Sequence, residues 1–264
     1  MKSITEFNYM EGSLYIAVGS MYAKEYFSSE MKKAAEYAAE NIQKEFNLML
    51  EELMWIDSKT KALVHKKLHD MKAHIAYPEE ILDRKLIGII YEGLKLDSQS
   101  YFENILTLKK FMSDYKVKEF KQDTDKQSWK THGMVTTVDA YYNPTDNSIL
   151  IPAGILDGVL YQSDWPNYMN YGSLGMLAGH EITHGFDDQG SQYDEEGNLV
   201  DLWEPSTKKQ FNLKARCIIE HYGNLTVDVD GQPMSVNGIN AQEENIADIG
   251  GAKGAIRAYA RHTL

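Results

Sequence analysis

The chain has 264 residues, 43% of them hydrophobic and 25% charged, which is the composition of an ordinary globular protein. It carries 27 Lys and Arg against 39 Asp and Glu, a formal net charge of −12. This acidity disfavours a broad nucleic-acid-binding surface, because carboxylates repel phosphates. No apolar run reaches the roughly 18 residues of a membrane-spanning helix, and the first residues lack the apolar core of a secretory signal. We therefore expect no membrane span and no nucleic-acid partner.

Cys217 is the one cysteine, which excludes an internal disulfide and an all-cysteine metal site. Free cysteines are among the most buried residues, so we favour a packed thiol on a helix. The alternative is a thiol whose partner lies outside this chain.

The first half of the sequence is typical of helices. Apolar residues recur every three or four positions from Met31 to Leu53, which predicts a long amphipathic helix. Asp57 is placed to cap a second helix, whose apolar stripe runs from Val64 to Ile75 and which Tyr77-Pro78 ends. Residues 84–130 are rich in lysine, and we interpret their charge runs as the solvated face of further helices.

β-Favouring runs appear after residue 130. Residues 134–138 and 149–151 flank a loop of turn-forming residues, 143–147, and predict a hairpin. Two further helices are predicted over 171–186 and 243–259, and a polar loop follows the first of them. The second contains three glycines that lower helix stability, so we expect close packing against a neighbouring element at Gly250, Gly251 and Gly254.

The segment His180-Glu181-Ile182-Thr183-His184 is the strongest chemical signal. On a helix, histidines four residues apart lie on one face about one turn from each other, so both imidazoles can reach one zinc ion. Glu181 cannot bind the same ion from its position, but it can hold a water molecule and take its proton. The motif therefore indicates a catalytic zinc site rather than two incidental histidines.

A catalytic zinc ion needs a third protein ligand, and two glutamates compete for this role. Glu204 lies 20 residues after His184, as in thermolysin, but the proline that follows it favours a turn or helix start. Glu244 lies 60 residues after His184 within a predicted helix, and Asp248 on the same face can accept the N–H of a zinc-bound histidine. We favour Glu244 as the ligand and interpret Glu204 as a surface or capping acid. Asp187 stands where metzincins have glycine, which excludes that class.

Further motifs extend over nearly the whole chain. In order they are Ile75-Ala76-Tyr77-Pro78, Val138-Asp139-Ala140-Tyr141-Tyr142, Pro152-Ala153-Gly154-Ile155-Leu156, Asn170-Tyr171-Gly172, the segment from His180 to Asp188, Val236-Asn237-Gly238-Ile239-Asn240 and Glu244-Asn245-Ile246-Ala247-Asp248. Together they resemble the neprilysin and endothelin-converting-enzyme family of zinc metallopeptidases. The resemblance implies an α+β, mostly α fold: a zincin catalytic domain of the gluzincin, thermolysin-like type, with a small antiparallel sheet and a preceding helical segment.

The resemblance also implies a reaction and a set of residues for it. The activity would be that of a zinc metalloendopeptidase that hydrolyses oligopeptides on the amino side of hydrophobic residues. One Zn²⁺ per chain would be held by His180, His184 and Glu244. The catalytic residues would be Glu181, as general base, and Asp248, which would orient His180. Asp187 would be a further carboxylate behind a ligand or the cap of a loop.

In this family, an extended segment that normally reads Val-Asn-Ala-(Tyr or Phe)-Tyr binds the main chain of the peptide. Here Asp139 replaces the asparagine, and an ionised aspartate cannot donate a hydrogen bond, whereas Ala140 can still contribute through its backbone. Glu243 stands where the family usually has glycine and adds negative charge. The residue after the cleaved bond would occupy an apolar pocket, although core packing explains the same residues equally well: Ile155, Leu160 and Leu177.

The ends of the chain also differ from the family pattern. Family members continue with a segment that carries a transition-state-stabilising histidine, a carboxylate-binding arginine and a cysteine that pairs with the one at the Cys217 position. We therefore expect residues 1–130 to be a helical segment, the end of the family's N-terminal region with linker helices. Residues 131–264 would be a zincin catalytic domain without its C-terminal part.

This truncation bears on the expected function. Losing one oxyanion donor typically lowers the rate by about 10²–10³, so the chain alone is expected to be weakly active or inactive. The alternative is a non-catalytic zinc- and peptide-binding remnant of such a protease. In both cases the partners are oligopeptides, and the resemblance implies an extracellular or cell-surface location.

Overall fold

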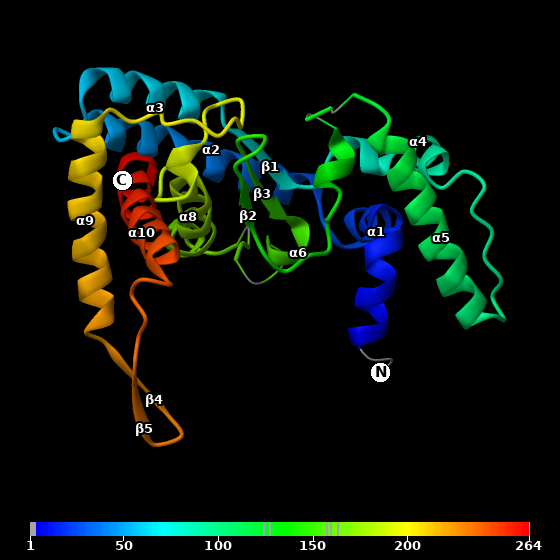
Figure 1. Ribbon diagram of the computed structural model, residues 1–264. Coiled ribbons are helices and arrows are strands. Elements are labelled where there is room, and N and C mark those ends of the chain that lie inside the picture. Colours follow the sequence, from blue (N-terminus) through cyan, green and yellow to red (C-terminus); the bar gives the residue numbers. More distant parts are fainter. Residues whose placement is uncertain are drawn as a thin grey trace.

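The computed structural model describes residues 4–123, 125–126, 128–156, 158, 160–162 and 164–263, and for residues 4–13 and 263 only the backbone. In Figure 1, α2, α3, α8, α9 and α10 lie on one side of a small sheet, and α1, α4 and α5 lie on the other. The α-helices are α1 (Ile4–Tyr26), α2 (Ser29–Glu51), α3 (Ser58–Asp70), α4 (Arg84–Ile90), α5 (Tyr101–Phe120), α6 (Ala153–Leu156), α7 (Asn167–Asn170), α8 (Met176–His184), α9 (Pro205–Gly223) and α10 (Gln242–Thr263). Shorter helical turns are η1 (Glu79–Leu82), η2 (Trp129–His132), the π-helical η3 (Tyr171–Gly175) and η4 (Gly190–Gln192). The strands are β1 (Lys72–Ala76), β2 (Tyr141–Asn143), β3 (Ser148–Pro152), β4 (Thr226–Val229) and β5 (Gln232–Ser235).

The central sheet has the order β1-β3-β2. β2 and β3 form the antiparallel hairpin expected from the sequence, but its first strand begins at Tyr141, so residues 134–138 are not part of it. β1 pairs with β3 in parallel, so the sheet is mixed. The prediction that the second helix continues to Ile75 is wrong, because α3 ends at Asp70 and the following residues pair with β3.

The predicted long helices are present. Ser28 caps α2 and Asp57 caps α3, each by accepting a backbone N–H three residues ahead, as is usual for helix N-caps. α8 follows directly on the π-helical turn η3, so residues 171–184 form one continuous helical rod. No helix among the residues described here is both long and apolar enough to cross a lipid bilayer.

Glycines allow α10 to approach α8 closely. A Cβ atom at Gly179 would lie 2.9 Å from the Cα of Gly251, and one at Gly251 would lie 2.6 Å from the carbonyl oxygen of Met176. A Cβ at Gly250 would likewise overlap the side chain of Thr183. The expected close packing is thus confirmed at Gly250 and Gly251, whereas Gly254 has only ordinary space around it.

A buried carboxylate fixes α10 against α2. Glu45 of α2 is fully buried, and it accepts hydrogen bonds from Arg257 Nε and Arg261 Nε, each at 2.6 Å. Arg257 also donates two hydrogen bonds to Glu52 at the end of α2. Since charge-assisted hydrogen bonds are the stronger ones in proteins, this network sets the position of α10 and hence of its first turn.

The single cysteine lies on α9. Cys217 is exposed on this helix, so the interpretation as a packed thiol is wrong. Beyond α9, the hairpin of β4 and β5 projects away from the helical body (Figure 1), and all of its strand residues are exposed.

A buried histidine of η2, His132, and a half-buried one of β1, His74, lie against each other. The rings of His74 and His132 stack face to face, with centroids 3.4 Å apart. The Nε2 atom of each is buried and has no hydrogen-bond partner among the described residues. Burial lowers the pKa of His74 to about 4, and the neighbouring His132 and Lys72 act in the same direction.

The lowered pKa of His74 predicts that the stability of the folded chain depends on pH. The unfolded chain binds a proton at His74 more readily than the folded chain. The contribution of neutral His74 to the free energy of unfolding is therefore complete above pH 6.5 and is lost as the pH falls towards 4. We expect the urea midpoint of the zinc-free chain to fall through this window, and we expect His74→Phe to reduce the fall. A variant that keeps the full pH dependence of the wild type would contradict the assignment.

Candidate metal centre

α8 presents His180 and His184 on the same face. Their Nε2 atoms are 2.9 Å apart and their rings meet edge to face, with centroids separated by 4.6 Å. Both side chains are largely buried, with exposed fractions of 14% and 17%. The spacing of four residues therefore brings two imidazole nitrogens to one point, as the sequence predicts.

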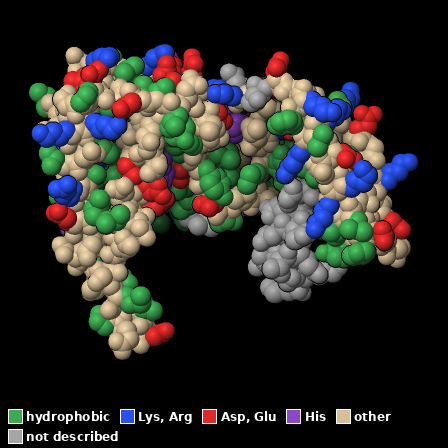
Figure 2. Space-filling view, in the orientation of Figure 1, with side chains coloured by type: hydrophobic (Ala, Val, Ile, Leu, Met, Phe, Trp, Pro, Cys, Tyr) green, Lys and Arg blue, Asp and Glu red, His purple; other side chains and the backbone are tan. Residues whose placement is uncertain are grey.

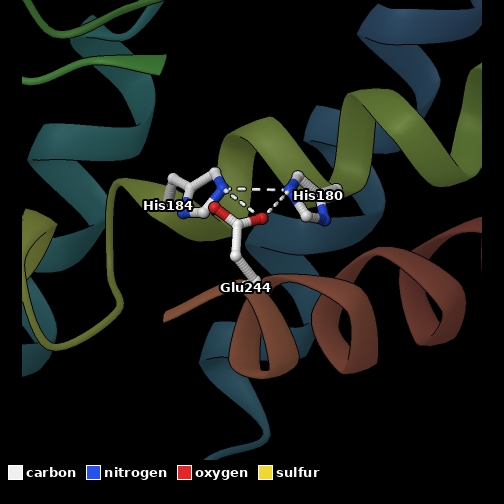
Figure 3. Close-up of side chains that lie close together, drawn as sticks. All are labelled: His180, His184 and Glu244. Atoms are coloured by element: carbon white, nitrogen blue, oxygen red, sulfur yellow. Dashed lines mark hydrogen bonds and ion pairs between the residues drawn. The ribbon is translucent and has the colours of Figure 1, made fainter. Parts of the chain in front are cut away.

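α10 supplies a carboxylate to the same point. Figure 3 shows Glu244, in the first turn of α10, with its carboxylate directed at both imidazoles. Its Oε2 atom lies 3.2 Å from His180 Nε2 and 3.8 Å from His184 Nε2. These are the three side chains that converge on one possible metal position in the part of the chain that is described. Glu204 is elsewhere: it precedes α9 and pairs with Lys59.

The donor set fits a zinc ion. Ligands at the corners of a tetrahedron around zinc, with bonds of about 2.0–2.1 Å, lie about 3.4 Å from one another. The three distances found here, 2.9, 3.2 and 3.8 Å, surround that value. Three acceptor atoms facing one another this closely repel unless a cation or a proton lies among them.

Two aspartates fix the tautomers of the histidines. Asp248 Oδ1 lies 2.9 Å from Nδ1 of His180, and Asp187 Oδ2 lies 2.7 Å from Nδ1 of His184. A carboxylate accepts the hydrogen of Nδ1, which leaves the lone pair on Nε2 free to bind a metal. Asp187 Oδ1 also accepts the backbone N–H groups of Gln189 and Gly190, so this one side chain both orients a histidine and caps a loop.

Glu181 lies beside the three donors without joining them. It is 4% exposed and faces the cavity that His180 and His184 line. Burial raises its pKa to about 7; the nearby His184 opposes this effect, and the carboxylates of Glu244 and Asp139 add to it. A divalent cation bound nearby would lower this pKa again, because it favours the carboxylate form.

An open cavity of about 540 Å³ lies over the metal position. Three of the residues predicted to bind substrate, Asp139, Ala140 and Leu177, line it, and so does Glu243. Figure 2 shows acidic side chains gathered beside a histidine over α8 and α10, at the edge of this hollow. Asp139 is exposed, and its Oδ1 accepts the backbone N–H of Ala140.

Two of the residues expected to bind substrate lie outside this cavity. Ile155 is in α6 and packs against the hydrophobic core. Leu160 lies in the turn before α7, where its carbonyl oxygen accepts a hydrogen bond from Ser173. Neither side chain is among those that line the cavity, and α6 packs against β1 and β3.

Other residues of the cavity wall were not predicted individually as substrate contacts. They come from β2, from the turn after it and from the loop after α8: Tyr141, Tyr142, Pro144, Gln189, Gly190 and Tyr193. The tyrosines extend the segment that contains Ala140, which is a usable signal. The loop residues carry no chemical pattern of their own. Only the position of this loop directly after α8 could have indicated that its residues line the cavity.

Comparison with known proteins identifies the family of this chain. Residues 5–78 and 139–264 match two models that are both described as peptidase family M13. The chain belongs to peptidase family M13. This membership confirms the resemblance to neprilysin and the endothelin-converting enzymes that the sequence motifs carry.

Individual M13 members match over nearly the whole chain. Neprilysin-2 of Drosophila melanogaster is 45% identical over 249 residues, which cover 94% of this chain and 32% of that protein. Human neprilysin is 38% identical over 254 residues, 96% of this chain and 33% of that protein. The zinc metalloprotease Zmp1 of Mycobacterium tuberculosis, solved with an inhibitor, superposes with a TM-score of 0.81 at 32% identity, over 96% of this chain and 37% of that chain. The chain thus spans about a third of the length of these curated M13 relatives.

Proposed function

We propose that this chain is the catalytic region of a zinc-dependent metalloendopeptidase that hydrolyses oligopeptides. The observation that carries the proposal is the convergence of two imidazole nitrogens and one carboxylate oxygen within 4.8 Å of one another, at the base of an open cavity. Membership of peptidase family M13 supports the same reaction class. By resemblance, we further propose an extracellular or cell-surface setting.

In the proposed site, His180, His184 and Glu244 hold the zinc ion. When bound, zinc supplies Lewis acidity, which polarises the carbonyl of the scissile bond and makes water more acidic. Asp248 and Asp187 keep Nδ1 of the two histidines protonated, so that both Nε2 atoms present lone pairs.

Glu181 is the proposed general base. Its carboxylate faces the cavity one position along the helix from His180, where it can take a proton from the attacking water and deliver it to the leaving amine. Burial raises the pKa of Glu181 and a bound zinc ion would lower it, and the ionised carboxylate that zinc favours is the form that accepts the proton from water.

The peptide is proposed to bind in an extended conformation along β2, the strand at one edge of the central sheet. Asp139 and Ala140 directly precede β2 and line the cavity, so their backbone groups can pair with the main chain of a peptide. Leu177 offers apolar contact, consistent with cleavage on the amino side of hydrophobic residues.

Asp139 offers a direct test of this binding mode. Asp139→Asn restores a donor to the position where the family has asparagine, and one added hydrogen bond contributes about 0.5–1.5 kcal/mol. We expect the variant to lower KM roughly 2- to 10-fold with little change in kcat. The matched control is Asp114→Asn on the exposed surface of α5, which should change neither.

The proposal as a whole is tested by measuring zinc stoichiometry and peptidase activity on the same chain. One zinc ion per chain, together with hydrolysis of a quenched peptide that a chelator abolishes, would support it. Zinc and peptide binding without turnover would support the non-catalytic remnant instead, and no zinc binding would refute both.

A further inference from the structure

Lys67 is a fully buried lysine on the inner face of α3, with 2% of its surface exposed. Its Nζ atom donates hydrogen bonds to the carbonyl oxygens of Gly190 at 2.6 Å and Tyr193 at 2.7 Å. The aromatic rings of Tyr142 and Phe186 flank the same ammonium, with centroids 5.7 and 5.8 Å away. The side chain thus reaches from α3 into the loop that follows α8, although more than a hundred residues separate the two in sequence.

The loop that Lys67 holds is the one that orients a metal donor. The backbone N–H groups of Gln189 and Gly190 donate to Asp187 Oδ1 at 2.8 and 2.7 Å, and the other oxygen of Asp187 binds Nδ1 of His184 at 2.7 Å. At Gly190 the loop also lies directly on the end of α8, where an added Cβ would overlap the carbonyl oxygen of His184. Any movement of Gly190 is therefore transmitted to Asp187 and to the ring of His184.

A charge at this position is not explained by packing. Burying an ammonium group is unfavourable, and an apolar side chain such as methionine would fill the space without that cost. Burial lowers the pKa of Lys67 to about 8, against the attraction of Asp187, Asp194 and Glu195. An apolar residue would, however, leave the carbonyl groups of Gly190 and Tyr193 without this donor.

We propose that Lys67 is a positioning residue of the metal centre: it anchors the loop from Gly190 to Tyr193 so that Asp187 stays aligned with Nδ1 of His184. The inference rests on the proposed zinc site, but it concerns how that site is preorganised. Partners that orient metal-binding histidines commonly contribute 10- to 100-fold to metal affinity. Lys67 acts one step further away, through the loop.

The test measures zinc affinity by competition with a chromophoric chelator, with zinc alone as the probe. We expect Lys67→Met to weaken zinc binding about 10-fold. The matched control is Lys66→Met: Lys66 is the adjacent, exposed lysine, and it pairs with Glu195, which lies beyond the loop from Gly190 to Tyr193. Lys66 does not contact the carbonyl groups of Gly190 and Tyr193 that Lys67 holds, so this variant should bind zinc like the wild type. Equal affinity of Lys67→Met and the wild type would overturn the inference, whereas a wild-type chain that binds no zinc would refute the proposed function itself.

A double-mutant cycle separates positioning from general destabilisation. If Lys67 acts through Asp187, then Lys67→Met should change zinc affinity less than twofold in an Asp187→Asn background. A merely structural role would instead give the same loss in both backgrounds, which would contradict the inference.

Hydrogen exchange on the wild-type, zinc-free chain decides the matter if Lys67→Met fails to fold. A loop held by Lys67 predicts that the amides of Gln189 and Gly190 are protected before zinc is added. Exchange of these amides at unprotected rates would show that the loop is not anchored and would overturn the inference.

Discussion

Glu244→Gln should reduce bound zinc from one ion per chain to an undetectable level. The carboxylate is the one anionic donor of the site, and the neutral amide that replaces it is a weak ligand for zinc. The two histidines remain, but a pair of imidazoles alone leaves the ion with too few protein ligands for tight binding. Zinc content after gel filtration, measured by atomic absorption, checks this result.

The control for this experiment is the other glutamate that the sequence offers. Glu204 pairs with Lys59 at the start of α9, away from the histidines, so Glu204→Gln should keep one zinc ion per chain. If Glu204→Gln instead emptied the site while Glu244→Gln retained zinc, the ligand assignment would be wrong.

Glu181→Gln should separate catalysis from metal binding. The glutamine keeps the shape of the side chain and can still hydrogen-bond water, but it cannot accept a proton. Because a general base contributes about 10²–10⁴ to the rate, we expect kcat for peptide hydrolysis to fall by that factor while zinc content stays at one per chain.

The matched control removes a carboxylate that lies outside the cavity. Glu220 is exposed on α9, so Glu220→Gln should leave both kcat and zinc content unchanged. An active Glu181→Gln variant would exclude Glu181 as the base and would require another group to accept the proton.

The metal centre is largely predictable from the sequence because its spacing is local. Two histidines four residues apart must share a face of a helix, and Glu244 and Asp248 are related in the same way on another helix. The meeting of the two helices is a non-local event, but Gly250 and Gly251 indicated that α10 packs closely on something. That α8 is its neighbour comes only from the structure.

The strands were harder to predict because their pairing is non-local. Residues 68–75 carry apolar side chains at helical spacing, yet Lys72–Ala76 forms a strand because β3 offers it a parallel partner. Conversely, the β-favouring run at 134–138 finds no strand partner in the structure. The hairpin register is instead set by the turn before β3, where Asn147 adopts a φ of +50°.

The supporting groups around the site were also beyond the sequence. Lys67 interrupts no obvious pattern on α3, and its partners lie in a loop more than a hundred residues later. Ile155 and Leu160 were predicted to line a substrate pocket but do not line the cavity. An apolar residue near a motif can belong to the hydrophobic core as well as to a pocket, and the sequence does not distinguish the two. Sequence spacing therefore located the groups that meet at the metal position, and tertiary contacts decided what surrounds them.

A crystal structure of the zinc-loaded chain, with anomalous diffraction recorded at the zinc absorption edge, tests the central claim most directly. The account predicts a single strong anomalous peak, about 2.0–2.2 Å from Nε2 of His180, Nε2 of His184 and a carboxylate oxygen of Glu244. A peak bound by other residues, or no peak between α8 and α10 in a folded, zinc-saturated chain, would contradict it.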